Sequence, residues 1–161
     1  MRRDRFLIGI LGFIGVLVVA AVALFFVRGR APAYGSEDTP TGVLHNYAVA
    51  LQLRDYDRAY GYLAEKAGRP SREAFRQAFL SHQLDVSATG LQIDRTEMDS
   101  ADEALVDVTV LSGGSDPFSR GSDSGGTAML VRQNGAWRIA SMPFPYWGWD
   151  WYQPTPLPAK P

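Results

Sequence analysis

The sequence predicts an α+β domain that follows a membrane-spanning helix. Residues 6–27 form an apolar run, apolar residues recur at helical spacing after residue 39, and from about Val86 apolar and polar residues alternate. Helical spacing followed by strand alternation is typical of helices that cover one face of an antiparallel sheet. The chain beyond the apolar run is about the size at which a single core is buried, so we expect one globular domain.

The first element is the run "FLIGILGFIGVLVVAAVALFFV", residues 6–27, which carries no charge. About twenty apolar residues cross a hydrocarbon core of roughly 30 Å as a helix, so we expect a single-pass span in contact with the lipid bilayer. A cleaved signal peptide ending at "APA" is the alternative. The run is longer than the apolar core of a signal peptide, and Arg28 and Arg30 follow it, which favours an uncleaved anchor.

Charge sets the expected orientation and excludes one class of partner. Three arginines within residues 1–5 outweigh the two after the span, so we expect a cytoplasmic N-terminus and an extracytoplasmic C-terminal domain in the cell membrane. From residue 31 onward the chain has eleven basic and sixteen acidic residues, a net charge of −5. Because phosphate contacts need clustered Arg and Lys, we expect no nucleic-acid binding. The chain has no cysteine, which excludes disulfides and thiolate chemistry.

Residues 28–38 are expected to be a linker, and three helices to follow it. Thr39 fits an N-cap with Pro40 in the first turn, and Asp55 and Ser71 fit the caps of the second and third helices. The expected buried positions are Val43, Leu44, Tyr47, Ala48 and Leu51 in the first helix, Tyr56, Ala59, Tyr60 and Leu63 in the second, and Phe75, Ala78, Phe79 and His82 in the third.

Strand patterns fill the second half of the chain. "LQIDRTEM" is a weak strand, and "ALVDVTVL" places Ala104, Val106, Val108 and Val110 on one face and Asp107 on the other. "TAMLVRQNGAWRIASM" predicts a hairpin that turns at Asn-Gly, with a type I′ turn. The stretch "SGGSDPFSRGSDSGG", residues 112–126, is rich in Gly, Ser and Asp, so we expect a long mobile loop.

The segments "TPTGVLHNYAVALQLRDYDRAYGYLAEKA" and "QNGAWRIASMP" together resemble the cone fold of the nuclear-transport-factor-2-like superfamily, which is cystatin-like. The resemblance covers residues 39–145. It implies about three helices packed on a curved antiparallel sheet. With an anchor in front, the chain is most similar to lumazine-binding-like extracytoplasmic domains of bacteria, and to the anchored N-terminal domain of some penicillin-binding proteins. This resemblance implies a place in the bacterial cell envelope.

Enzymes that this chain resembles through its fold, such as ketosteroid isomerase and SnoaL-type polyketide cyclases, use a carboxylate inside the cone. The purest apolar face here, residues 104–110, carries no acid on its inner side, and Asp55 and Asp57 fit helix capping. His45 and His82 are far apart and lack a nearby acid at ligand spacing, so we expect no metal and no cofactor. The favoured function is a non-enzymatic binding or assembly module. A small-molecule enzyme or carrier using the cone, and a structural module that forms a homodimer through its sheet face, remain alternatives.

The aromatic end of the chain, "PFPYWGWDWYQP", begins a tail at residues 146–161. If it is extended, Trp147, Trp149 and Trp151 share one face. The strip then either folds back to close the cone, or presents a platform for an envelope protein or polysaccharide, or contacts the membrane interface. Tyr47 and Tyr60 could line the mouth of a pocket. These five aromatic residues are the candidate binding residues.

Overall fold

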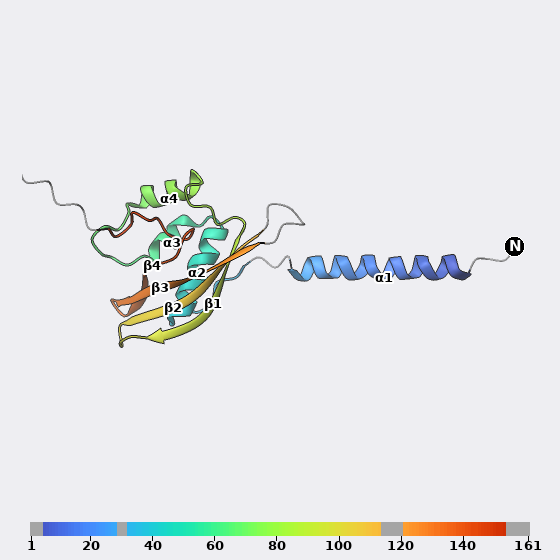
Figure 1. Ribbon diagram of the computed structural model, residues 1–161, viewed down its shortest axis with the longest axis horizontal. Helices are drawn as coiled ribbons and strands as arrows, with labels where there is room; N and C mark the ends of the chain where they lie inside the picture. Colours follow the sequence, from blue (N-terminus) through green and yellow to red (C-terminus); the bar gives the residue numbers. More distant parts are fainter. Residues whose placement is uncertain (1–4, 29–31, 114–120, 154–161) are drawn as a thin grey trace, which may run out of the picture. The chain divides into compact units, whose positions relative to one another are not determined.

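The computed structural model describes residues 5–28, 32–113 and 121–153 (Figure 1). It divides into two compact units, Met1–Pro32 and Ala33–Pro161. The first contains one helix, α1 (Arg5–Arg28), of 24 residues. Among the described residues, no helix combines the length and the apolar character that crossing a membrane requires.

Three helices open the second unit: α2 (Pro40–Gln52), α3 (Tyr56–Gly61) and α4 (Arg72–Leu80). The predicted caps are confirmed, because side-chain oxygens of Thr39, Asp55 and Ser71 accept hydrogen bonds from backbone N–H groups three residues later, at 3.1, 3.2 and 3.1 Å. Each cap satisfies one of the N–H groups that a helix start leaves without a partner. The beginnings of all three helices are therefore encoded locally.

A four-stranded antiparallel sheet follows, in the order β1-β2-β3-β4. Its strands are β1 (Thr89–Met98), β2 (Glu103–Ser112), β3 (Ser122–Gln133) and β4 (Ala136–Ser141). The predicted inner face of β2 is confirmed, since its four residues are at most 1% exposed: Ala104, Val106, Val108 and Val110. The hairpin prediction is also confirmed, because Asn134 and Gly135 both have positive φ, 52° and 79°, as a type I′ turn requires.

Two local predictions were wrong. Part of the loop expected over residues 112–126 is strand, since β3 begins at Ser122, which pairs with Ser112 at the end of β2; residues 114–120 lie outside the described part. Backbone groups make this ladder, so a Gly- and Ser-rich sequence does not prevent it. His82 does not extend the buried stripe, because α4 ends at Leu80 and His82 is exposed with a φ of 59°.

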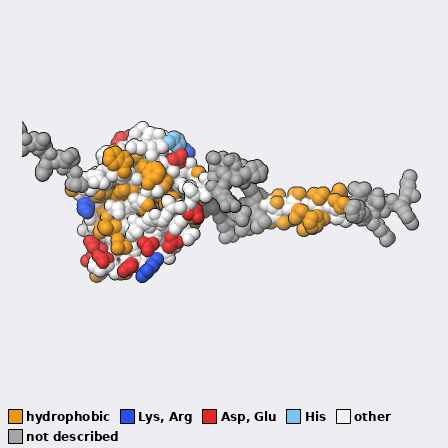
Figure 2. Space-filling view, viewed as in Figure 1, with side chains coloured by type: hydrophobic (Ala, Val, Ile, Leu, Met, Phe, Trp, Pro, Cys, Tyr) orange, Lys and Arg blue, Asp and Glu red, His pale blue; other side chains and the backbone are white. Residues whose placement is uncertain are grey.

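The helices lie on one face of the sheet, and the core fills the space between the two layers (Figure 1). Helix α2 packs against β1, β2 and β4, and α3 packs against α2 and α4. After α3 the chain joins the sheet edge, where Ala64 N–H donates to the carbonyl of Ile139 at 2.8 Å. The observed architecture is the predicted α+β class, with three helices over an antiparallel sheet. On the surface of the domain, acidic side chains gather in the lower part of the view in Figure 2.

Candidate functional site

Four of the five candidate binding residues converge on Phe75 of α4, which sequence reasoning had not included in the site. The ring centroids of Tyr47, Tyr60 and Trp151 lie 6.5, 5.6 and 5.3 Å from that of Phe75. Trp147 joins through Trp151 at 5.2 Å. Phe75 and Tyr47 are fully buried, and both indoles are only 7% exposed. We call these five residues the aromatic cluster; it is packing inside the core.

Trp149 lies apart from the aromatic cluster, with 80% of its surface exposed. The predicted common face of the three tryptophans does not form, because the segment turns instead of staying extended: Trp151 N–H donates to the carbonyl of Gly148 at 3.2 Å. The Trp151 ring packs so closely on Gly148 that a Cβ there would lie 2.5 Å from its Nε1 atom. The turn buries Trp147 and Trp151 and leaves Trp149 in solvent.

Hydrogen bonds hold this C-terminal segment over the core. The Tyr47 hydroxyl donates to the carbonyl of Tyr146 at 2.7 Å, and the N–H and hydroxyl of Tyr152 donate to the carbonyls of Gly68 and Ala64 at 2.8 and 2.5 Å. Burial raises the pKa of Tyr47 well above its ordinary value and that of Tyr152 to about 12. The phenols therefore act as neutral donors that close the core.

Among the described residues, the buried interior holds no carboxylate and no histidine. Apart from tyrosine and tryptophan, Asn46 is the one polar side chain buried in this described part. Its amide oxygen accepts from Gly35 N–H at 2.7 Å and its amide nitrogen donates to the Gly35 carbonyl at 3.0 Å. Asp107 lies on the outer face of the sheet, where Thr127 donates to it at 3.0 Å.

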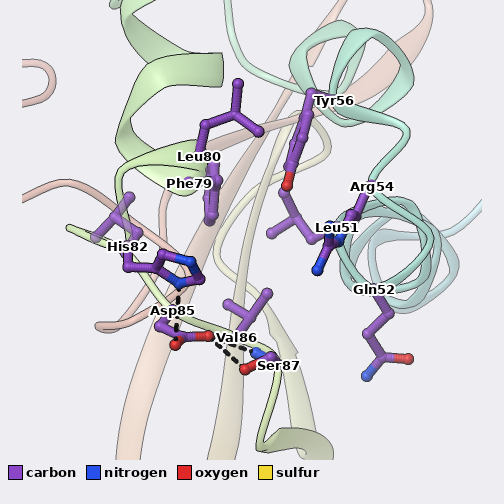
Figure 3. Close-up of a pocket in the computed structure, with 11 residues that line it drawn as sticks. Leu51, Gln52, Arg54, Tyr56, Phe79, Leu80, His82, Asp85, Val86 and Ser87 are labelled. Carbon is purple, nitrogen blue, oxygen red and sulfur yellow. Dashed lines mark hydrogen bonds and ion pairs between the residues drawn. The ribbon is translucent and has the colours of Figure 1, made fainter.

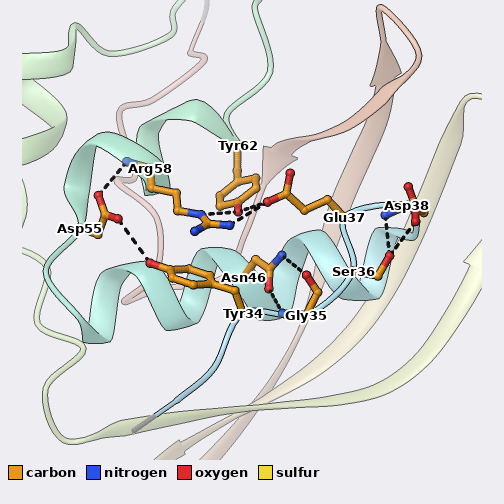
Figure 4. Close-up of polar contacts among 9 residues, drawn as sticks. All are labelled: Tyr34, Gly35, Ser36, Glu37, Asp38, Asn46, Asp55, Arg58 and Tyr62. Carbon is orange, nitrogen blue, oxygen red and sulfur yellow. Dashed lines mark hydrogen bonds and ion pairs between the residues drawn. The ribbon is translucent and has the colours of Figure 1, made fainter.

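Acidic side chains near the start of the domain hold the segment before α2 in place (Figure 4). Asp55 caps α3 and also lies 3.4 Å from the Tyr34 hydroxyl. The Arg58 guanidinium stacks 3.5 Å from the Tyr34 ring centroid and pairs with Glu37 at 3.0 Å. Tyr62 donates to Glu37 at 2.6 Å, and this hydrogen bond is the main cause that lowers the pKa of Glu37.

The other residues considered as chemical groups also have structural partners. His45 Nε2 lies 3.0 Å from the carbonyl of Ala33, and Asp57 pairs with Arg72 at 3.4 Å. Within the described ranges, no three His, Asp or Glu side chains come together as metal ligands. Residues 33–38 of the predicted linker thus lie against the helices.

A pocket of about 100 Å³ lies where α2 ends, α3 begins and α4 ends (Figure 3). Its apolar wall consists of Leu51, Phe79, Leu84 and Val86, which are at most 7% exposed. Around it stand the guanidinium of Arg54, the hydroxyl of Tyr56 and the ring of His82, which all point toward the middle of the pocket (Figure 3). This site is distinct from the aromatic cluster, although Phe79 touches both.

Asp85, the carboxylate that lines this pocket, is hydrogen-bonded within its own loop. It accepts hydrogen bonds from the hydroxyl and the N–H of Ser87, at 2.6 and 2.9 Å, and lies 3.4 Å from His82 Nδ1. The hydroxyl bond from Ser87 is the main cause that lowers the pKa of Asp85. Among the residues drawn in Figure 3, neither Arg54 nor Tyr56 takes part in a hydrogen bond or ion pair. The pocket therefore offers hydrogen-bond donors above an apolar floor.

Two residues that line the pocket, Arg54 and His82, have left-handed backbone. Arg54 and His82 each have a φ of 59°, and each directly follows the C-cap of a helix. Glycine is the usual residue at this position, because a Cβ is strained there. The sequence does contain a signal for this conformation. In "LQLRD" and "FLSHQ", where two helices end, the usual glycine is missing. Sequence reasoning missed it because neither residue belongs to a catalytic or metal motif.

Comparisons with known proteins leave the family of this chain open. No protein-family model matches the chain, and no curated protein matches it in sequence. Solved structures similar to it include a SEC-C motif containing protein from Rhodopseudomonas palustris, with 11% identity, a TM-score of 0.49 and coverage of 66% of this chain and 79% of that chain. A nuclear-transport-factor-2-like protein of unknown function from Shewanella oneidensis has 13% identity, a TM-score of 0.48 and coverage of 62% and 90%.

A third similar structure is an uncharacterised cystatin-fold protein from Novosphingobium aromaticivorans, with 14% identity, a TM-score of 0.46 and coverage of 66% of this chain and 97% of that chain. At these identities and TM-scores, none of the similarities carries a function to this chain.

Proposed function

We propose that this chain is a membrane-anchored binding module of the bacterial cell envelope, built on a nuclear-transport-factor-2-like domain. Residues 6–27 anchor it as a single-pass helix, residues 1–5 stay in the cytoplasm, and the domain binds a partner outside. The anchor and its orientation are supported by the uncharged run and by its arginine-rich N-terminal flank. The whole run lies within the single helix α1.

The observation that carries the binding role is the closed, apolar interior of the domain. An isomerase-like reaction needs a carboxylate in a cavity that admits substrate. Among the described residues, the core side chains facing the sheet are uncharged, and the C-terminal segment covers them through Trp147, Trp151 and Tyr152. Binding is therefore assigned to the surface, where the exposed indole of Trp149 and the pocket beside Arg54 are accessible.

The anchor is tested by producing the full chain in bacterial cells and extracting the membranes with alkaline carbonate. The expected result is that the chain stays in the membrane pellet and that protease added to spheroplasts degrades the domain. A matched variant with Leu17→Arg and Val18→Arg should be released, because two charges at the centre of the span are costly in hydrocarbon. Recovery of a soluble chain that begins near residue 34 would contradict the proposal.

The binding role is tested by co-purification with the anchor intact. We expect an envelope protein or a polysaccharide to accompany the full chain, and Trp149→Ala to reduce its yield, since exposed tryptophans dominate binding surfaces. Phe144→Ala is the matched control, because Phe144 is another exposed aromatic residue, at 68%. Equal loss with both variants, or with neither, would count against a role of Trp149.

A further inference from the structure

We propose that the pocket beside Arg54 binds a small carboxylate with a compact apolar body, such as an aromatic or branched aliphatic acid. This small ligand is additional to the envelope protein or polysaccharide expected above, so the inference goes beyond the proposed binding function. It assigns a site outside the space between helices and sheet, at the end of the helical layer (Figure 3).

The pocket supplies hydrogen-bond donors for an anion. The guanidinium of Arg54 and the hydroxyl of Tyr56 point into the pocket and are joined to none of the other residues that line it. The His82 ring stands opposite, held by Asp85 on its Nδ1 side. A guanidinium presents a planar fork of N–H groups that matches the two oxygens of a carboxylate. The pocket therefore has its strongest complementarity for that group.

The acidic side chains near the pocket have other partners. Asp85 accepts two hydrogen bonds from Ser87, Asp57 pairs with Arg72, and Asp55 accepts from Arg58 N–H and lies near Tyr34. None of these contacts uses the guanidinium of Arg54. Its positive charge is thus available to an anion from solvent.

The size and the lining of the pocket fit a compact apolar group. About 100 Å³ of space lies against Leu51, Phe79, Leu84 and Val86. For comparison, an apolar cavity of about 150 Å³ holds a benzene molecule. A pocket of this size that is open at its mouth fits one ring or one branched chain. A bare inorganic anion would leave the apolar wall in contact with water, and a neutral ring would leave Arg54 without a partner.

The backbone is strained at two of the residues that line the pocket. Arg54 and His82 are two of the four non-glycine residues with positive φ in the described part of the chain, and both line this pocket. Non-glycine residues in such conformations cluster at functional sites, where the side chain is needed despite the strain. Glycine would relieve the strain at either position but would remove the group that faces the pocket.

The test is an NMR titration of the full chain in detergent micelles with benzoate, corrected by a titration of empty micelles. Benzamide has the same ring without the charge, and acetate has the charge without the ring. The expected result is that benzoate binds at least about tenfold more tightly than either, since both the ionic contact and the apolar contact contribute. Equal affinity for benzoate and benzamide would overturn the proposal.

Variants separate binding from folding. Arg54→Gln should weaken benzoate binding at least about tenfold, whereas Arg95→Gln on β1 should leave it within about twofold. Arg54→Gly should weaken binding as much and yet raise Tm by about 3 °C, because the left-handed strain is relieved. Unchanged benzoate affinity in Arg54→Gln overturns this inference. The carbonate extraction described above tests the membrane anchor, whereas the benzoate titration tests the pocket. Either proposal can therefore fail without the other.

Discussion

The aromatic cluster and the pocket beside Arg54 both lie between helices, and yet they differ in how their polar groups are used. In the cluster, Tyr47 donates to a backbone carbonyl and the rings are buried against Phe75. At the pocket, Arg54 and Tyr56 point donors at open space, and the backbone of Arg54 is left-handed. The difference teaches that the clustered aromatic residues of this domain stabilise its fold. The ligand is instead assigned to the pocket, where unpaired donors and strained backbone lie beside an apolar wall.

The largest effect that sharpens this comparison is expected from Phe75→Ala. Phe75 is fully buried and touches the rings of Tyr47, Tyr60 and Trp151, so its loss leaves a cavity in the cluster. We expect the free energy of unfolding to fall by about 3–5 kcal/mol, measured by urea denaturation. A loss below about 1 kcal/mol would show that the cluster is not what holds the domain together.

The next effect is expected from Tyr47→Phe. The ring stays buried, but the carbonyl of Tyr146 loses the hydroxyl that donates to it at 2.7 Å. A buried acceptor without a partner costs about 1–3 kcal/mol, which urea denaturation should detect. Tyr60→Phe is the control, since its hydroxyl donates to the Pro70 carbonyl at a partly buried site, where water can replace it. An equal loss in both variants would contradict the claim that the buried hydrogen bond of Tyr47 stabilises the domain more than the partly buried one of Tyr60.

Alkaline pH should weaken the contact of the C-terminal segment with the core through Tyr152. Burial raises the folded-state pKa of Tyr152 from 10.0 to about 12, so the folded state holds this proton more tightly than the unfolded state does. The stabilisation is complete below the unfolded pKa near 10 and is lost as pH rises through about 12. Thermal unfolding followed across this window should show a smaller loss of Tm in Tyr152→Phe. Parallel losses in both proteins would rule out Tyr152 as a cause.

The smallest effect on stability is expected from Trp149→Ala. With 80% of its surface exposed, the residue lies outside the packed core, so the free energy of unfolding should change by no more than about 0.5 kcal/mol. Trp151→Ala, two positions later, should cost several times more, because Trp151 packs on Phe75 and Phe79. Equal costs would mean that the two indoles are not divided between surface and core.

What the sequence predicted correctly depends on short-range chemistry. Thr39, Asp55 and Ser71 cap helices through hydrogen bonds to residues three positions away, and the Asn134-Gly135 turn requires only its own two residues. Alternation along residues 104–110 was enough to divide the two faces of β2. These features follow from the local backbone, and a single sequence displays them directly.

What the sequence did not show depends on contacts between distant segments. Nothing near Trp151 reveals that its ring meets Phe75, and nothing near Trp149 reveals that its neighbours turn away from it. The pocket was missed for a related reason. Arg54 and His82 come together only when the fold brings the ends of α2 and α4 to the same pocket. Of the five candidate residues, four were thus found as neighbours in space, but in a packing role.

The most direct test of the division between packed interior and binding surface is a methyl NMR spectrum of the full chain in micelles, with leucine and valine labelled, during benzoate titration. The pocket assignment predicts shifts at Leu51, Leu84 and Val86, and unchanged signals from Val106 and Val108 on the inner face of the sheet. Shifts at Val106 and Val108, with none at the pocket, would place the ligand inside the fold and contradict the account.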